Sequence, residues 1–226
     1  MGRWQGIFLD FYGTLASGDL LAVESVCQRV IDDYGVDAQA SHLAVQWGHR
    51  YFAAIEAIDG GGFRSLREIE HDTLIETVAP LAGRIDAKPY IDDLNQYLLQ
   101  PTLYDEVREV LEQLALPVCI VSNADECELQ GALAHHGLQF DHVVSSELAR
   151  SYKPDHRIFE TALELTGWPP ERVIHVGDSL HSDVGGARRV GISAAWVSRA
   201  ERISDIGTEK PDFTWPDLRP LLTLQD

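Results

Sequence analysis

The chain has 226 residues, of which 45% are hydrophobic and 24% charged, so it is long enough and apolar enough to bury a core. Its 18 Lys and Arg stand against 36 Asp and Glu, which gives a formal net charge of −18. This acidity repels phosphate backbones and anionic lipid surfaces, so we expect neither nucleic acid nor a membrane as a partner. A small phosphorylated substrate is compatible with it, because one lysine and one metal ion can reverse the field locally.

Three features of the sequence predict a cytoplasmic protein. No apolar run approaches the ~18–20 residues that cross a bilayer. The first residues, Met1 to Asp10, reach a charge too early to form the apolar core of a signal peptide. Cys27, Cys119 and Cys127 are odd in number and lack the spacing of a metal site, so they are expected to be reduced thiols.

The first predicted elements are one strand and a long helical stretch. Residues 6–9 form a short apolar run bounded by polar residues, which predicts a buried strand. Residues 16–100 contain no such run, and helices are expected there over 20–34, 41–58, 65–81 and 91–99. Because this stretch lies between the first and second predicted strands, it predicts a helical cap inserted into another domain.

From residue 101 onward, short apolar runs alternate with helical patterns. Strands are expected over 117–121, 141–144, 173–176 and 193–197. Helices are expected over 104–114, 127–136, 155–166 and 183–190. This alternation is typical of a parallel sheet covered by helices on both faces. The sequence therefore predicts an α/β core of residues 1–15 and 101–226 with a helical cap of residues 16–100, and a tail, 203–226, that runs over the core surface.

Polar residues follow the predicted strands at the edge where a sheet of this kind binds its ligands. They are, in chain order, Asp10 with Tyr12, Gly13 and Thr14; Ser122 with Asn123; Lys153; and Asp178 with Asp183. Lys153 is one of only three lysines in the chain, so the occurrence of a lysine in this series by chance is less probable. We expect a carboxylate, hydroxyls, an ammonium and two further carboxylates to converge there.

These residues, in this order, resemble the four motifs of the haloacid dehalogenase superfamily of hydrolases. The predicted cap also lies where that family carries one, between the first two motifs. Members with this type of cap have a Rossmann-like core and a helical bundle that closes over the site. Most are magnesium-dependent phosphatases, and one branch removes halide from 2-haloacids. The resemblance thus implies a hydrolase that acts on a small molecule.

The resemblance implies a role for each residue that handles the substrate. Asp10 ends a buried strand and is the expected nucleophile, which forms a covalent intermediate. Ser122, Asn123 and Lys153 are expected to bind the transferring phosphoryl group, with Lys153 acting as a compact positive charge. Thr14 is expected to donate a hydrogen bond from its hydroxyl group within the site.

The resemblance also implies a Mg²⁺ site. Its ligands would be the carboxylates of Asp10, Asp178 and Asp183 and the backbone carbonyl of Tyr12. Magnesium favours a few carboxylates together with water and substrate phosphate. Asp183 can also cap the helix that follows it or reach Lys153, and these roles are compatible with one another.

Tyr12 departs from the pattern of the family's phosphatases. Those enzymes usually carry a second aspartate at this position, which protonates the leaving oxygen and later activates water. A phenol is a poor general base at neutral pH. An aromatic residue here is the form seen in the haloacid dehalogenases, which expel a halide and need no proton. A substrate group, Asp125 or a metal-bound water are candidates to replace the missing acid.

The fourth motif and the cap favour the phosphatases instead. Asp178 and Asp183 keep the acidic pair that dehalogenases of this branch replace with small polar residues.

Gly48 stands where those dehalogenases usually place an arginine, so Arg50 is the candidate to bind a substrate anion. His49, Tyr51 and Arg64 are further candidates to line the site. Three carboxylates in one pocket repel one another unless a cation is present. We therefore expect a magnesium-dependent phosphohydrolase of a small phosphorylated metabolite.

Three alternatives stay open. The first is a metal-independent 2-haloacid dehalogenase that uses Asp10 as its nucleophile. The second is cleavage of a carbon–phosphorus bond through a Schiff base on Lys88, the single lysine of the cap. The third is a protein that binds a phosphoryl ligand on a degenerate scaffold without turnover.

Overall fold

The structure is a computed structural model that describes residues 2–58, 62–199 and 209–225. Contacts divide the chain into two units. The core unit consists of residues 1–17, 102–123 and 138–226, and the cap unit consists of residues 18–101 and 124–137.

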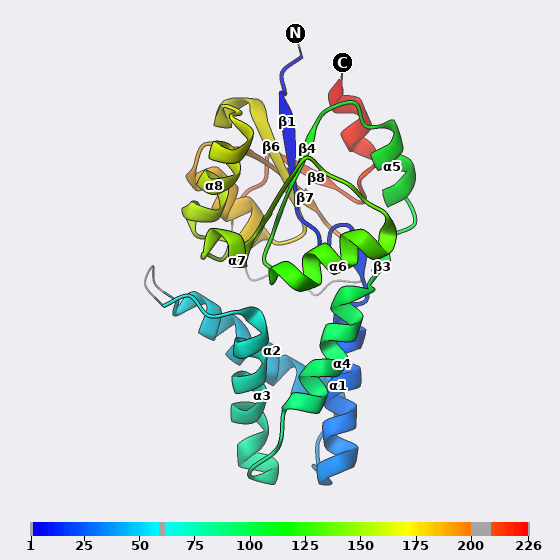
Figure 1. Ribbon diagram of the computed structural model, residues 1–226, viewed down its shortest axis with the longest axis vertical. Helices are drawn as coiled ribbons and strands as arrows, with labels where there is room; N and C mark the ends of the chain where they lie inside the picture. The colour runs from blue at the N-terminus through cyan, green and yellow to red at the C-terminus, as the bar shows by residue number, and fades with distance from the viewer. Residues whose placement is uncertain (1, 59–61, 200–208, 226) are drawn as a thin grey trace. The chain divides into compact units, whose positions relative to one another are not determined.

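The core is built on a six-stranded sheet in which every pair of neighbouring strands is parallel (Figure 1). The strand order is β5-β4-β1-β6-β7-β8, which confirms the predicted α/β fold. The strands are β1 (Gly6–Leu9), β4 (Val118–Ser122), β5 (His142–Ser145), β6 (Val173–Gly177), β7 (Ser193–Val197) and β8 (Phe213–Trp215). Strand β1 is buried along its whole length, as its continuous apolar run predicts for a strand covered on both faces.

Short helices connect or follow the core strands. They are α5 (Val107–Gln113), α7 (Ser146–Ala149), α8 (His156–Thr166), α9 (Gly186–Arg189), the 3₁₀ turns η1 (Pro170–Arg172) and η3 (Arg219–Gln225), and the π-helical turn η2 (Leu180–Gly185). The turn η2 directly follows the end of β6, and π-helical turns are frequent at functional sites. It carries Asp183, one of the predicted site residues.

The tail of the chain is part of the core, which corrects the expectation that it runs over the surface. Residues 213–215 form the edge strand β8, which pairs with β7 through Ala195 and Phe213. Leu218 and Leu221 are fully buried. A strand of three residues is too short to show an alternation of apolar and polar residues, so sequence periodicity could not reveal it. Of the tail, residues 203–208 and 226 lie outside the described part of the chain.

A small antiparallel ribbon lies where the chain leaves the core and returns to it. Strand β2 (Ala16–Ser17) pairs with β3 (Thr102–Leu103), and both belong to the core unit. Beyond the ribbon, Tyr104 N donates a hydrogen bond to Leu15 O at 3.0 Å. The loop that carries Asp10 is therefore tied to the returning connection.

The cap contains the four predicted helices and one more. They are α1 (Asp19–Tyr34), α2 (Ala40–Glu56), α3 (Leu66–Ala82), α4 (Lys88–Leu99) and α6 (Glu126–His136). From sequence, α6 was expected in the core, but it packs against α4 and clusters with the cap. A Cβ on Gly131 would lie 2.4 Å from Leu99 Cδ2, so a glycine allows the two helices to approach closely.

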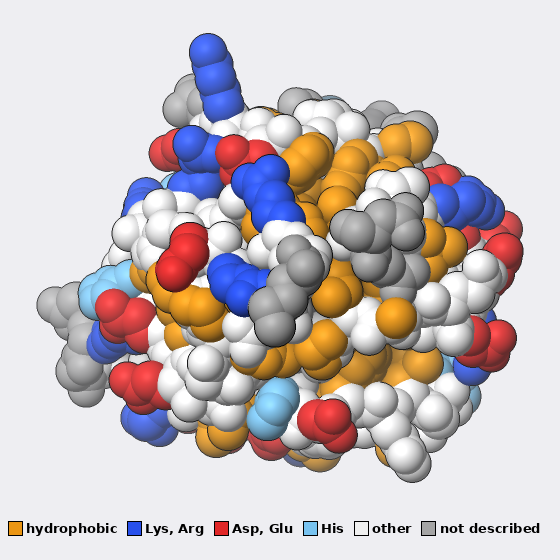
Figure 2. All heavy atoms as spheres, turned by 90° about the horizontal axis from the view of Figure 1, so that it is seen from above, with side chains coloured by type: hydrophobic (Ala, Val, Ile, Leu, Met, Phe, Trp, Pro, Cys, Tyr) orange, Lys and Arg blue, Asp and Glu red, His pale blue; other side chains and the backbone are white. Residues whose placement is uncertain are grey.

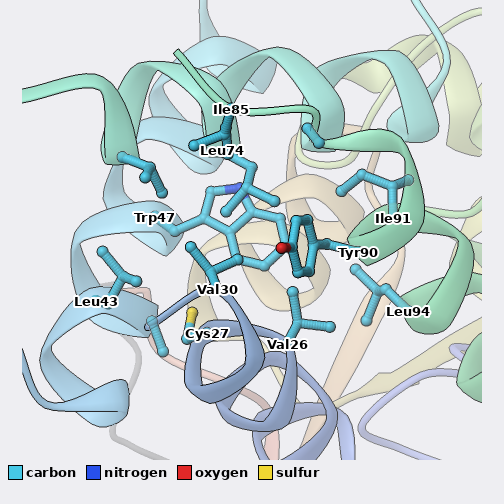
Figure 3. Close-up of a cluster of buried hydrophobic side chains, with 13 residues drawn as sticks. Val26, Cys27, Val30, Leu43, Trp47, Leu74, Ile85, Tyr90, Ile91 and Leu94 are labelled. Atoms are coloured by element: carbon cyan, nitrogen blue, oxygen red, sulfur yellow. The ribbon is translucent and has the colours of Figure 1, made fainter. Parts of the chain in front are cut away.

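Trp47 occupies the centre of the cap's hydrophobic core. Figure 3 shows its ring surrounded by side chains from the cap helices, including Val30 of α1, Leu74 of α3 and Ile91 of α4. The indole N–H donates to Thr73 Oγ1 at 3.0 Å, so its polar atom is satisfied within the core. Trp47 thus stabilises the cap from inside.

Acidic and basic side chains are interspersed on the face of the molecule that Figure 2 shows. Acidic and basic side chains there surround a central group of hydrophobic side chains. The formal charge of −18 is therefore not gathered into one acidic patch on that face. Across residues 2–58, 62–199 and 209–225, no helix combines the length and the hydrophobicity needed to span a bilayer.

Glu70 of α3 is a buried carboxylic acid within the cap. Among the residues that the structure describes, its Oε2 has no hydrogen-bond partner. Burial and the negative charges of Asp125 and Glu128, which face it, raise the pKa of Glu70 to about 8, and Arg67 opposes this shift. The folded protein therefore keeps this carboxyl group protonated at neutral pH, because ionising it would leave an unpaired buried charge.

We predict that Glu70→Gln removes a pH-dependent loss of stability. Between the ordinary value of 4.5 and the folded pKa of about 8, the folded state binds one proton more than the unfolded state. Stability of the wild type therefore falls as the pH rises through this window. In urea unfolding, the variant should match the wild type to within about 1 kcal/mol near pH 5 and exceed it by on the order of 3 kcal/mol at pH 8.

The matched control is Glu76→Gln, which changes an exposed glutamate on the same helix. Its stability difference from the wild type should stay nearly constant with pH. A Glu70→Gln difference that does not grow between pH 5 and pH 8 would contradict the assignment.

Candidate active site

Asp10 and Ser122 meet at the carboxyl edge of the sheet because β1 and β4 are neighbours. Asp10 directly follows β1, and its backbone N–H donates to Val176 O of β6 at 2.9 Å. Ser122 ends β4, and its Oγ donates to Asp10 Oδ1 at 3.0 Å. Both residues are buried. The strands on either side of β1 therefore both hold Asp10, β6 through its backbone and β4 through its carboxylate.

Lys153 is buried and its ammonium group joins two carboxylates. Its Nζ donates to Asp10 Oδ1 at 2.7 Å, to Asp183 Oδ1 at 2.7 Å and to Val121 O at 2.9 Å. Burial by itself would lower the pKa of Lys153, but the charges of Asp10 and Asp183 outweigh it and raise the pKa. The lysine is thus a fixed positive charge beside the carboxylate of Asp10.

Asn123 holds the backbone of Lys153. Its Oδ1 accepts from Lys153 N at 2.7 Å, and its Nδ2 donates to Lys153 O at 3.1 Å. These two bonds connect the end of β4 to the segment that carries the lysine. They make Asn123 a positioning residue for Lys153, and its direct contact with a phosphoryl group stays a prediction.

Asp183 is held by groups on three sides. Its Oδ1 accepts from Lys153 and lies 2.8 Å from His175 Nε2, and its Oδ2 accepts from Ser179 N at 3.0 Å. Burial alone would raise the pKa of its carboxyl, but the charge of Lys153 and the bond from His175 hold that pKa well below its usual value. A Cβ on Gly177 would lie 2.1 Å from Asp183 Cγ, so only glycine leaves room for this carboxylate.

His175 is a site residue whose part the sequence did not reveal. It is fully buried in β6. Its bond to Asp183 shows that it orients a carboxylate of the site. The available signal was its position in β6 two residues before Gly177, which puts both residues on the same face of the strand.

Asp178 completes an acidic cluster. Thr14 Oγ1 donates to Asp178 Oδ1 at 3.2 Å, and Trp196 Nε1 donates to Asp178 O at 2.8 Å. Asp10, Asp178 and Asp183 each present an oxygen such that these atoms lie within 4.8 Å of one another. Residues that are far apart in the sequence thus form one oxygen-rich site.

The residues present fit a divalent cation such as Mg²⁺. Within the described residues, Asp10 Oδ2 is buried and lacks a hydrogen-bond partner, which is costly for a carboxylate oxygen unless a cation binds it. The ammonium group of Lys153 is one positive charge against three carboxylates. Hard cations prefer oxygen ligands of this kind. The predicted set of Asp10, Asp178 and Asp183 therefore has suitable chemistry and spacing.

Tyr12 and Arg50 contact neighbours within their own units. Tyr12 is half-buried and its ring contacts Phe11 edge-to-face at 4.9 Å. Arg50 lies on α2 of the cap with 48% of its side chain exposed, 3.9 Å from Glu76. The contacts predicted between cap residues and substrate, including those of His49, Tyr51 and Arg64, stay predictions.

Asp125 has a defined role within the cap unit. Its two carboxylate oxygens accept from Leu66 N at 2.8 Å and from Arg67 N at 3.0 Å, which are the first amides of α3. These amides have no partner inside the helix, so Asp125 satisfies them and interacts favourably with the helix dipole. Its suggested part in proton transfer stays a prediction.

Comparison of the sequence with known proteins identifies the family of this chain. The model of the haloacid dehalogenase-like hydrolases matches residues 4–191, a range that includes all four motifs. An (S)-2-haloacid dehalogenase of Pseudomonas sp. strain YL is 26% identical over 97% of this chain and 94% of its own. A phosphoserine phosphatase of Thermus thermophilus is 37% identical over 79% of this chain and 72% of its own.

A solved structure agrees with the fold. The L-2-haloacid dehalogenase of Xanthobacter autotrophicus superposes with a TM-score of 0.79 at 24% identity, over 98% of both chains. The α/β core with its helical cap is therefore shared with a known hydrolase. Together with the match over residues 4–191, this shows that the chain is an enzyme of the haloacid dehalogenase-like hydrolase family.

Proposed function

We propose that the chain hydrolyses phosphate monoesters of small molecules, with Mg²⁺ as cofactor and an aspartyl-phosphate intermediate at Asp10. The observation that carries this proposal is the position of Asp178, whose carboxylate lies close to those of Asp10 and Asp183. A cation turns that repulsive arrangement into a binding site for a phosphoryl group.

The first step is attack by a carboxylate oxygen of Asp10 on phosphorus. The bond from phosphorus to the ester oxygen breaks, and its electron pair leaves with that oxygen, which takes a proton from water. Lys153 and Ser122 both contact Asp10 Oδ1 and hold the carboxylate in place. The charge of Lys153 also offsets the negative charge that builds up as the two anions meet.

The second step is hydrolysis of the aspartyl phosphate. Water attacks phosphorus, the bond between phosphorus and Asp10 breaks, and inorganic phosphate leaves while the carboxylate is restored. When bound, Mg²⁺ would be held by the carboxylates of Asp10, Asp178 and Asp183 and by the Tyr12 carbonyl, and would neutralise charge on the phosphoryl oxygens. Asp183 and His175 keep Lys153 in place during both steps.

Dehalogenation of 2-haloacids is the second candidate, and specific observations favour it. Relatives that are (S)-2-haloacid dehalogenases align over nearly the whole chain, whereas the phosphoserine phosphatase aligns over less of it. Taken together, the relatives favour dehalogenation. Tyr12 also fits a reaction that needs no proton donor. We place this candidate second because a metal-independent reaction would leave Asp178 and Asp183 beside Asp10 without the cation that three neighbouring carboxylates favour.

The first experiment measures phosphate release from p-nitrophenyl phosphate and phosphoserine, and halide release from 2-chloropropionate, each with Mg²⁺ and with EDTA. We expect phosphate release that needs Mg²⁺ and is lost in Asp10→Asn, which keeps the shape of the side chain and removes the nucleophile. Halide release that persists in EDTA, without phosphate release, would establish the second candidate instead.

A second prediction concerns Asp178. Asp178→Asn should lower kcat/KM for phosphate esters by about 100-fold or more and raise the Mg²⁺ concentration needed for half-maximal rate. The control is Asp141→Asn, the same change at an exposed position of the core. If the chain is a dehalogenase, Asp178→Asn should keep or raise halide release, because a carboxylate that repels the substrate is gone.

A third prediction concerns Tyr12, which stands where the family's phosphatases usually carry a general acid. Tyr12→Asp places a carboxyl group two residues after the nucleophile and should raise phosphate turnover by at least about tenfold, through proton transfer to and from oxygen. Tyr12→Asn has the same size without the titratable group and should show no such gain. Unchanged or reduced turnover in Tyr12→Asp would count against the argument.

A further inference from the structure

Arg199 is a buried arginine that contacts the loop carrying the nucleophile. It lies in the core unit two residues beyond β7 and is 9% exposed. Its Nη2 donates to the backbone carbonyl of Thr14 at 2.7 Å. Its Nη1 lies 2.7 Å from Glu106 Oε1, and its guanidinium carbon lies 3.6 Å from the centre of the Tyr104 ring. Three different chain segments thus meet at one guanidinium group.

The Thr14 peptide is the link between Arg199 and the acidic cluster. The loop after Asp10 is a tight turn in which Phe11 O accepts from the backbone N–H groups of Thr14, Leu15 and Ala16. The side chain of Thr14 donates to Asp178, and its carbonyl accepts from Arg199. The next carbonyl, that of Leu15, accepts from Tyr104 N. A shift of the Thr14 peptide would therefore move both the turn that follows Asp10 and the hydroxyl bound to Asp178.

Net stability does not account for this arrangement. Burying an ion pair costs desolvation energy, and apolar residues of similar size often serve the fold as well or better. Within the described part of the chain, Arg199 Nε is also buried without a hydrogen-bond partner, which adds a further cost. An apolar side chain could not, however, donate a hydrogen bond to the Thr14 carbonyl. Orientation of the nucleophile loop is therefore the property that Arg199 contributes.

We propose that Arg199 is a positioning residue for the hydrolase reaction, which holds the Thr14 peptide so that Asp10 and the Thr14–Asp178 hydrogen bond keep their reactive arrangement. This inference rests on the proposed role of Asp10 as nucleophile, and it holds for either leaving group. Glu106 and Tyr104 support Arg199 from the connection through which the chain returns from the cap. The positions of Tyr104 and Glu106 are thereby linked, through Arg199, to the geometry of the nucleophile loop.

The test uses a double variant, Arg199→Met with Glu106→Gln, which removes both charges and leaves no unpaired buried carboxylate. We expect kcat to fall by about tenfold or more, because small misplacements of reacting groups are costly, while KM changes by less than about twofold. Arg199→Lys keeps the charge without the planar fork and should lose less. Glu106→Gln alone keeps an acceptor for Arg199 and should lose least.

A second readout separates positioning from a general loss of stability. Hydrogen exchange of residues 11–16 should become faster in the double variant, while exchange in β6 and β7 stays as in the wild type. The control is Arg188→Met, which removes an ion pair between α9 and Asp212 in the same core. It should change neither kcat nor exchange in residues 11–16.

The outcomes are distinct. An unchanged kcat in the double variant, or a lower kcat with unchanged exchange in residues 11–16, overturns the role of Arg199. If the wild type releases neither phosphate nor halide, the proposed function fails. Exchange in residues 11–16 then decides the inference alone, and an unchanged rate in the double variant overturns it.

Discussion

The ammonium group of Lys153 is the interaction on which the rest of the site depends. It bonds to Asp10, 143 residues away in the sequence, and to Asp183, 30 residues away. All three residues are buried, and a buried carboxylate without a partner would cost several kcal/mol or shift its pKa until it was neutral. Lys153 therefore pairs with the carboxylate of Asp10 and holds it at the edge of the central strand.

Much of the surrounding structure serves to place that ammonium group. Asn123 binds the backbone of Lys153, and His175 and Ser179 hold the carboxylate of Asp183 that faces it. Gly177 leaves the space that this carboxylate occupies. The fold thus surrounds one charge with groups whose positions are set by neighbouring strands. Such pre-organised charge is effective in catalysis because it needs no rearrangement when the reaction occurs.

Asp178 and Tyr12 give the site its particular character within the family. Asp178 brings a third carboxylate close to those of Asp10 and Asp183, and the proposed magnesium-dependent reaction rests on it. Tyr12 leaves the loop without the general acid that hydrolysis of phosphate esters usually needs. Several relatives of the chain are dehalogenases, whose reaction needs no such acid. The two positions lie on different loops, since Tyr12 follows β1 and Asp178 follows β6.

Local patterns were enough to predict most of the fold and to place the candidate site residues at one edge of the sheet. Apolar runs such as 6–9 and 193–197 correspond to strands, and the rule that parallel strands bind ligands at their carboxyl ends brought Asp10, Ser122 and Asp178 together. These inferences succeed because each depends on periodicity within a short window and on chain order. The helices of the cap were recognised for the same reason.

The tertiary structure alone decided which partners these residues have. The contacts of Lys153 with Asp183, of Arg199 with Thr14 and of Asp125 with α3 join segments between 30 and 185 residues apart. No local pattern records such pairings, because a charged residue in a sequence looks the same whether it is solvated or buried. The place of α6 beside the cap helices and of β8 at the edge of the sheet has the same origin. Composition and periodicity set the elements, and the long-range contacts of buried polar groups set the site.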